Sequence, residues 1–166
     1  MDSELAFRAQ LVIQDHCRLF DYWRKQAGGK LVPSRKDIDP SGFRNLLPHV
    51  CLVDIENGMD DAVFRLAGTR VCDVYGIEVT GTCLRDIDWG ARAEYWGAIY
   101  KNILDNCTPM QGVVRGPVAG REHVTASWLR LPLSDDGARV NKILCHDIPA
   151  AKNDLLAPTA TLNRVA

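Results

Sequence analysis

The fold is decided by the stretch HVCLVDIENGMDDAVFRLAGT, residues 49–69. Its first eight residues are rich in valine, leucine and isoleucine, which are residue types typical of strands. Asn57-Gly58 then gives a turn signal, and residues 62–67 again have strand character. The stretch therefore predicts two antiparallel strands, residues 49–56 and 62–67, joined by a loop of roughly five residues.

Toward the C-terminus from this hairpin, the chain continues with one helix and further strands. Residues 91–106 repeat large apolar side chains at helical spacing, and Pro109 ends the segment. Three strand patterns follow, at residues 111–118, 123–133 and 140–148. Two strands before the helix and three after it predict an α+β fold, a five-stranded antiparallel sheet with helices on one face.

Toward the N-terminus lies an amphipathic segment, residues 3–27, which predicts one long helix that ends at Gly28-Gly29. Its apolar stripe either packs only on its own domain or also meets a partner helix, because periodicity does not distinguish a core from an interface. The dimer-interface candidates on this helix are Leu5, Val12, Leu19, Phe20 and Trp23.

The composition narrows the class of protein. A chain of 166 residues with 46% hydrophobic and 25% charged residues has the size and balance of one folded domain. Its 20 basic and 21 acidic residues give a net charge of -1, so we expect no nucleic-acid partner. Without a signal-peptide pattern or a membrane-spanning stretch, we expect a cytoplasmic protein with no membrane insertion. Six cysteines are scattered without a C-x-x-C pair, so we expect no metal site.

Short motifs recur along the chain in a specific order and spacing. They are Phe20-Asp21-Tyr22-Trp23, Gly28-Gly29, PSRKDIDP (residues 33–40), Leu46-Leu47-Pro48, FRLAGT (residues 64–69), YGIEVTG (residues 75–81) and Leu131-Pro132-Leu133. Together they resemble the PAS domain superfamily over roughly residues 15–149, and most closely its small stand-alone members from alphaproteobacteria. The resemblance implies an N-terminal cap or dimerisation helix at residues 1–29, a PAS-like core at 30–149 and a C-terminal tail at 150–166.

The resemblance also implies a curved sheet whose concave face encloses a ligand pocket or a packed core. The ligand-pocket candidates there are Arg65, Tyr75, Trp89, Trp96, Tyr100 and Trp128. Aromatic side chains with a polar end bind ring-shaped ligands and also fill cores, so both interpretations stay open. Arg65 either points inward, where it needs an acid such as Asp54 or an anionic ligand, or points outward to solvent.

The sequence also bears on sensors that use flavin or haem. Cys83 lies in a sequence that differs from that of flavin-binding light sensors, which argues against flavin photochemistry. The helix at 91–106 contains no histidine that could bind haem iron. The four histidines lie elsewhere, at His16, His49, His123 and His146. A haem- or small-ligand-binding sensor therefore stays as an alternative, and the cofactor is unknown.

A small cavity enzyme is the remaining alternative. It would use buried carboxylates for proton transfer, and the candidates are Asp54, Asp73 and Asp147. These three form no recognisable pair, so we assign no catalytic residue. The leading hypothesis is a non-catalytic regulatory PAS module in signal transduction, acting as a homodimer or by docking to a protein partner, with a small-molecule ligand left open.

Overall fold

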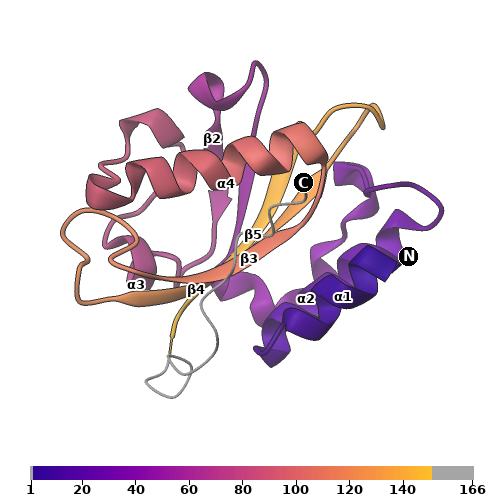
Figure 1. The fold of residues 1–166 in the computed structure, drawn as a ribbon, viewed down its shortest axis with the longest axis horizontal. Coiled ribbons are helices and arrows are strands. Elements are labelled where there is room, and N and C mark those ends of the chain that lie inside the picture. Colours follow the sequence, from indigo (N-terminus) through magenta and orange to yellow (C-terminus); the bar gives the residue numbers. More distant parts are fainter. Residues whose placement is uncertain (1, 151–166) are drawn as a thin grey trace.

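A five-stranded antiparallel sheet runs through the protein in the computed structural model, which describes residues 2–150 (Figure 1). The strands are β1 (Val50–Asp54), β2 (Val63–Ala67), β3 (Met110–Arg115), β4 (Thr125–Leu133) and β5 (Lys142–Pro149). Their order across the sheet is β2-β1-β5-β4-β3, so β5 lies at the centre and pairs with both β1 and β4. The predicted hairpin and the predicted α+β class with five antiparallel strands are confirmed.

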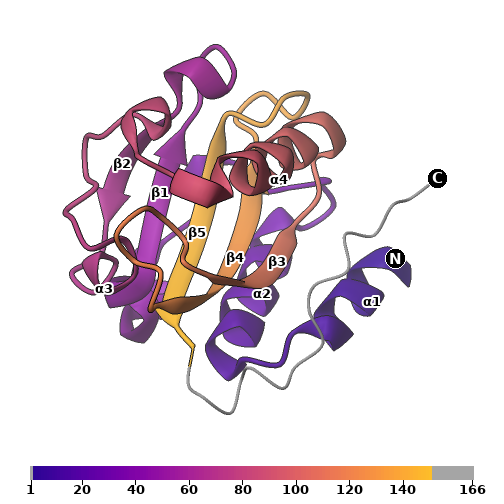
Figure 2. The same ribbon diagram turned by 60° about the vertical axis from the view of Figure 1, so that its left-hand side comes forward.

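Helix α4 (Ala93–Asn106) lies across one face of this sheet, together with the short helix α3 (Cys72–Tyr75) (Figure 2). The residues of α4 that face the sheet recur at three- and four-residue steps, and they are Trp96, Ile99, Tyr100 and Ile103. The helix ends at Cys107, which takes the left-handed conformation with a φ of 54°. We call the face under α4 the inner face of the sheet.

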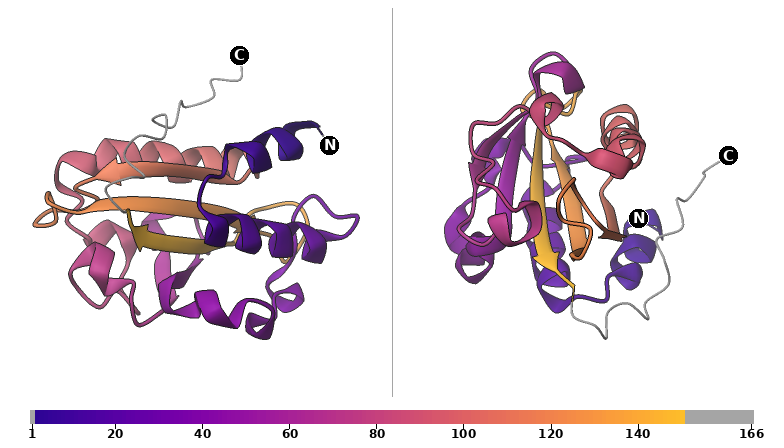
Figure 3. Two further views of the ribbon diagram at one scale, coloured as in Figure 1. Left: turned by 90° about the horizontal axis from the view of Figure 1, so that it is seen from below. Right: turned by 90° about the vertical axis from the view of Figure 1, so that its left-hand side faces the viewer.

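The opposite, outer face is covered by the helix α2 (Gln14–Ala27) and by the 3-10 segment η2 (Pro40–His49) (Figure 3). From α2, three large apolar side chains are buried against the sheet, and they are Leu19, Phe20 and Trp23. They meet leucines of the sheet, among them Leu129, Leu131 and Leu144. The fold therefore has helical layers on both faces, and the second layer consists of the N-terminal segment.

The N-terminal segment is helical, as predicted, but it is divided into α1 (Asp2–Gln10) and α2. Ile13 has extended backbone angles, φ -90° and ψ 122°, and precedes the first residue of α2. The β-branched pair Val12-Ile13 favours such an extended turn, while Leu11 stays buried at the break. Because the apolar spacing continues across the break, the sequence pattern alone predicted one helix.

Strand β4 shows how both faces of the sheet are used. Eight of its nine residues are buried, because alternate side chains point to the two covered faces. Leu129 and Leu131 lie in the outer core under α2, whereas Trp128 lies in the inner core under α4. This alternation positions the side chains of the inner face that are described next.

Two sequence predictions concern the ends of the chain. The described part includes only Ala150 of the predicted tail at 150–166, so that prediction lies outside the described residues. The role of residues 1–29 as a cap or dimerisation element stays a prediction. Within residues 2–150, no helix is long and apolar enough to cross a membrane.

Candidate functional site

The inner face carries a buried ion pair at its centre. Arg130 on β4 and Asp147 on β5 both point under α4, although their strand positions are offset by two residues. Arg130 Nη1 donates to Asp147 Oδ1 at 2.7 Å, and Nη2 donates to Oδ2 at 3.2 Å. The two side chains are 0% and 1% exposed. A two-pronged contact of this kind is among the strongest pairings of a guanidinium with a carboxylate.

Two tyrosines complete the polar contacts of this pair. The Tyr75 hydroxyl accepts a hydrogen bond from Arg130 Nη2 and donates one to Asp147 Oδ2, both at 3.3 Å. The Tyr100 hydroxyl accepts from Arg130 Nε at 3.3 Å. Arg130 Nη1 also donates to the Leu129 carbonyl at 3.0 Å. Each nitrogen of the buried guanidinium therefore has a partner, which is what burial of a charge requires.

Burial determines the ionisation of these groups. It raises the pKa of both Tyr75 and Tyr100, so the phenols stay protonated and can act as donors. Burial alone would lower the pKa of Arg130, but the nearby Asp147 carboxylate raises it well above its usual value. Arg130 therefore stays charged at neutral pH.

Aromatic rings surround the guanidinium. Its carbon lies 5.2 Å from the Trp96 ring centroid, 5.7 Å from that of Trp128 and 5.9 Å from that of Tyr100. These distances are in the range of cation–π attraction. The indole N–H of Trp96 donates to the Pro117 carbonyl at 2.8 Å, and that of Trp128 donates to the Tyr95 hydroxyl at 2.9 Å. The ring system is thus fixed by hydrogen bonds as well as by packing.

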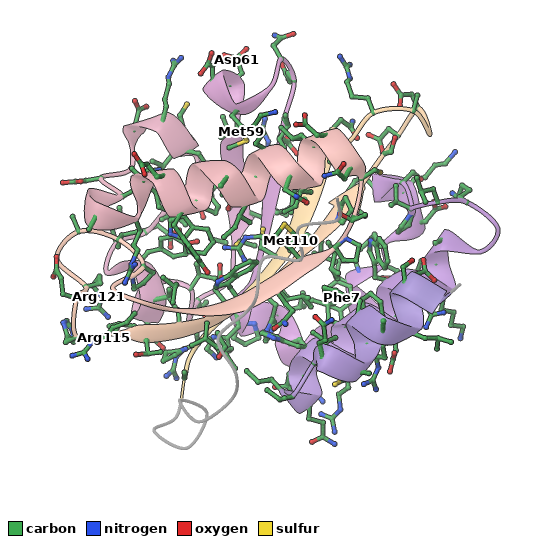
Figure 4. All side chains as sticks on the ribbon, viewed as in Figure 1. Phe7, Met59, Asp61, Met110, Arg115 and Arg121 are labelled. Carbon is green, nitrogen blue, oxygen red and sulfur yellow. The ribbon has the colours of Figure 1, made fainter. Side chains whose placement is uncertain are left out.

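Two further features hold this cluster in place. Gly112 on β3 lies opposite Trp128, and a Cβ atom there would come within 2.7 Å of the Trp128 ring. The absence of a side chain at Gly112 gives the indole its space. At one end of the sheet, Arg121 Nη2 donates to the Asp73 carbonyl at 2.6 Å, which ties the loop after β3 to α3 (Figure 4).

The ligand-pocket candidates divide into two groups. Five of them meet in this inner cluster, and they are Tyr75, Trp89, Trp96, Tyr100 and Trp128. Whether they bind a ligand stays a prediction. Arg65 lies elsewhere, because its side chain is 59% exposed and pairs with Asp54 at 2.8 Å. Of the two orientations left open for Arg65, the structure has the outward one.

The dimer-interface candidates also fall into two groups, one buried and one exposed. Leu19, Phe20 and Trp23 are buried inside the chain's own outer core, and the Trp23 indole donates to the Pro132 carbonyl at 2.9 Å. They offer no surface to a partner while α2 lies on the sheet. Leu5 and Val12 are 55% and 66% exposed. As an interface, these two residues stay a prediction.

Sequence reasoning did not identify Arg130, the centre of the inner cluster. The signal was present in SWLRLPL, residues 127–133, where one arginine interrupts an apolar strand. The sequence indicated Asp147 only as a candidate catalytic acid, and its carboxylate lies beside Arg130 and not beside a second carboxylate. Within residues 2–150, the histidines, cysteines and acids form no group of three that could hold a metal ion.

Comparisons with known proteins show the family to which the fold belongs. A family model described as PAS domain matches residues 13–146. No curated protein matches the chain. Among solved structures, the chain is similar to a LOV protein of Rhodobacter sphaeroides, with 17% identity, a TM-score of 0.50, and coverage of 70% of this chain and 72% of that one. It is also similar to a PAS domain from Colwellia psychrerythraea, with 11% identity, a TM-score of 0.49, and coverage of 69% and 99%. At 17% identity, the likeness to the Rhodobacter structure supports the fold alone.

Proposed function

Since the chain belongs to the PAS domain family, we propose that it is a non-catalytic regulatory module that signals through contacts with a second copy or a protein partner. One observation carries this proposal. The position where a ligand would lie, on the inner face, is occupied by the Arg130–Asp147 pair and its aromatic neighbours, whose polar groups satisfy each other. Because the chain's own side chains fill the interior, we expect signalling to use contacts at the surface.

The N-terminal helices are the proposed contact surface. Helix α1 folds back along α2 and is held by ion pairs near its two ends, Arg8–Asp21 at 2.7 Å and Arg24–Glu4 at 3.1 Å. Phe7 points toward the body of the molecule, and its ring lies 5.1 Å from that of Phe20 (Figure 4).

Exposed ion pairs hold an element weakly, because water and salt screen them. The attachment of α1 includes these pairs, a contact from Arg8 Nη1 to the Cys17 sulfur at 3.1 Å and the packing of Phe7 on the outer core, while Leu5 and Val12 remain exposed beside it. We propose that a homodimer buries these two side chains. The same proposal includes a cytoplasmic location and kinship with the small stand-alone PAS proteins of alphaproteobacteria.

The oligomeric state tests the proposed contact surface. Sedimentation equilibrium of the wild-type chain should give a dimer mass at micromolar concentration. The variants Leu5→Asp and Val12→Asp should be monomeric with unchanged circular dichroism. Ile77→Asp is the matched control, because Ile77 is 54% exposed and lies outside the N-terminal helices. A dimer that survives both N-terminal substitutions, or that is lost equally with Ile77→Asp, would argue against this surface.

A small-ligand sensor is the second candidate, and one observation favours it. Arg130, Asp147, Tyr75 and Tyr100 converge on one point of the inner face with donors and an acceptor. An anionic ligand could take the place of the Asp147 carboxylate beside Arg130. It would have to displace a charged group that is already paired, and for this reason we rank it second.

A further inference from the structure

Three histidines from three different elements meet in the outer core. His16 lies on the first turn of α2, His146 on the central strand β5, and His49 at the end of η2. The ring centroids of His16 and His146 are 5.0 Å apart, and those of His49 and His146 are 5.9 Å apart. His16 and His146 are fully enclosed, whereas His49 is half-buried. The contact thus joins the N-terminal helix directly to the centre of the sheet.

Three of the four nitrogens of the two enclosed rings lack a hydrogen-bond partner within residues 2–150. Nε2 of His16 and both ring nitrogens of His146 are buried and unpaired. By contrast, His49 Nδ1 donates to the Asp147 carbonyl at 3.1 Å. A neutral imidazole has one donor and one acceptor, and leaving them unpaired in a core is unfavourable. Buried polar atoms without partners are rare, and this contact is therefore unfavourable as packing alone.

The surroundings keep both rings neutral while α2 is in place. Burial, together with the smaller effects of the neighbouring His146 and Arg130, lowers the pKa of His16 to about 3. Burial likewise lowers the pKa of His146 to about 4, although the Asp147 carboxylate acts in the opposite direction. The charged or titratable groups that influence the two rings are Asp15 from α2 and His49 from η2, and, from the inner side of the sheet, Arg130 of β4 and Asp147 of β5.

We propose that His16 and His146 form a proton-sensitive latch, which holds α2 on the outer face at neutral pH and releases it as the pH falls. The inference rests on the proposed function in one respect, since α2 belongs to the surface through which we propose the module signals. The latch itself, however, is a property of the single chain.

The direction of the pH effect follows from the positions of the two histidines. Once α2 leaves the sheet, both rings meet water and titrate near pH 6.5. The docked rings have lowered pKa values, so the stabilisation by docking is complete above about pH 6.5 and is lost as the pH falls toward 4. Linkage gives an opening constant that rises about 10-fold from pH 7 to pH 6 and roughly 500-fold from pH 7 to pH 5.

Release of α2 would expose an apolar surface. Leu19, Phe20 and Trp23 would leave the leucines of β4 and β5 that they now cover. An exposed apolar face of this kind can bind a partner. Acidification would in this way convert a closed surface into one available for contact.

Hydrogen exchange measured by mass spectrometry tests the latch. Exchange of the wild-type chain is followed at pH 7, 6 and 5, with each rate divided by the intrinsic rate at that pH. Amides of residues 17–27 in α2 should lose protection relative to pH 7, by about 10-fold at pH 6 and by roughly 500-fold at pH 5. Amides of residues 96–106 in α4 are the internal control and should keep theirs. The double variant His16→Leu/His146→Leu should show the same α2 protection at every pH, because it has no proton to take up.

Two results would overturn the latch: α2 protection that does not change with pH, or loss of protection in α2 and α4 together, which would mean global unfolding. The measurement on the wild-type chain alone can confirm or overturn the latch, even if the double variant fails to fold. In that case His16→Leu should retain a response of about 20-fold between pH 7 and pH 5. A monomeric chain with a pH-dependent α2 would contradict the proposed dimer and keep the latch, whereas a dimer with a pH-independent α2 would do the reverse.

Discussion

Arg130 and Asp147 form a two-pronged ion pair, with contacts of 2.7 and 3.2 Å, in the part of the sheet interior that helix α4 covers. Neither side chain reaches solvent, and the hydroxyls of Tyr75 and Tyr100 accept further hydrogen bonds from the Arg130 guanidinium. The pair and its neighbours fill the space under α4 where a ligand would bind. The same contacts should therefore both stabilise the domain and exclude a ligand.

Removing one member of this pair should destabilise the fold strongly. Arg130→Met leaves the Asp147 carboxylate buried without a counter-charge, and we expect a loss of about 3–5 kcal/mol in the free energy of unfolding. Urea denaturation at pH 7 measures it. Arg65→Met is the matched control, since Arg65 is paired with Asp54 at the exposed surface and Asp54 also accepts from Lys142. The control should leave the urea midpoint nearly unchanged, and equal losses in the two variants would contradict the buried-pair account.

The double variant Arg130→Met/Asp147→Leu separates a missing partner from a missing interaction. It removes both charges and leaves side chains of similar size, so it should recover most of the stability lost by Arg130→Met. The same denaturation measurement applies. If the double variant is less stable than Arg130→Met, the pair contributes more than mutual neutralisation.

The space that Gly112 provides should be essential to the aromatic cluster. In Gly112→Ala the new methyl group would meet the Trp128 ring at 2.7 Å, and we expect a loss of about 1–3 kcal/mol from overpacking. Gly97→Ala makes the same chemical change within α4, where a Cβ atom meets nothing within 4 Å. There it should stabilise the protein by about 0.5–1 kcal/mol, because alanine favours helix over glycine. Thermal unfolding compares the two, and shifts of the same sign would be inconsistent with this packing.

The cysteines should report how tightly the inner core is closed. Cys51 and Cys145 are buried opposite each other on β1 and β5, while Cys72 is exposed. The hydrogen bond to Cys145 and burial raise the pKa of the Cys51 thiol, which further suppresses its reactivity. Alkylation at pH 8 followed by peptide mass mapping should modify Cys72 within minutes and spare Cys51 and Cys145 until the protein is denatured. Rapid modification of all three would mean that the interior opens readily.

The sheet could be predicted from the sequence because its signals are local. Asn57-Gly58 marks the first turn, and segments with strand character, the first rich in valine, leucine and isoleucine, flank it. The side of Arg65 was left open, and simple alternation does not hold there, because the register between β1 and β2 shifts between Leu52 and Val53, opposite Arg65. In β4, however, both faces are covered, so alternation did not reveal where Arg130 points.

The remaining features depend on contacts between distant parts of the chain. His16 and His146 meet only after α2 has docked on β5, and nothing in their local sequence indicates it. Leu19, Phe20 and Trp23 have the spacing of an interface, and the choice of the chain's own sheet as their partner is a tertiary outcome. A sequence pattern identifies an apolar stripe without identifying what covers it.

The mass of the native protein, compared with its denatured mass, tests the central claim most directly. Native mass spectrometry of the purified chain should give a dimer with twice the polypeptide mass and no additional component. That result is expected if Arg130, Asp147 and their aromatic neighbours fill the interior and the module acts through contact. A native species that sheds a small molecule on denaturation would contradict the filled interior, and it would make the chain a ligand sensor instead.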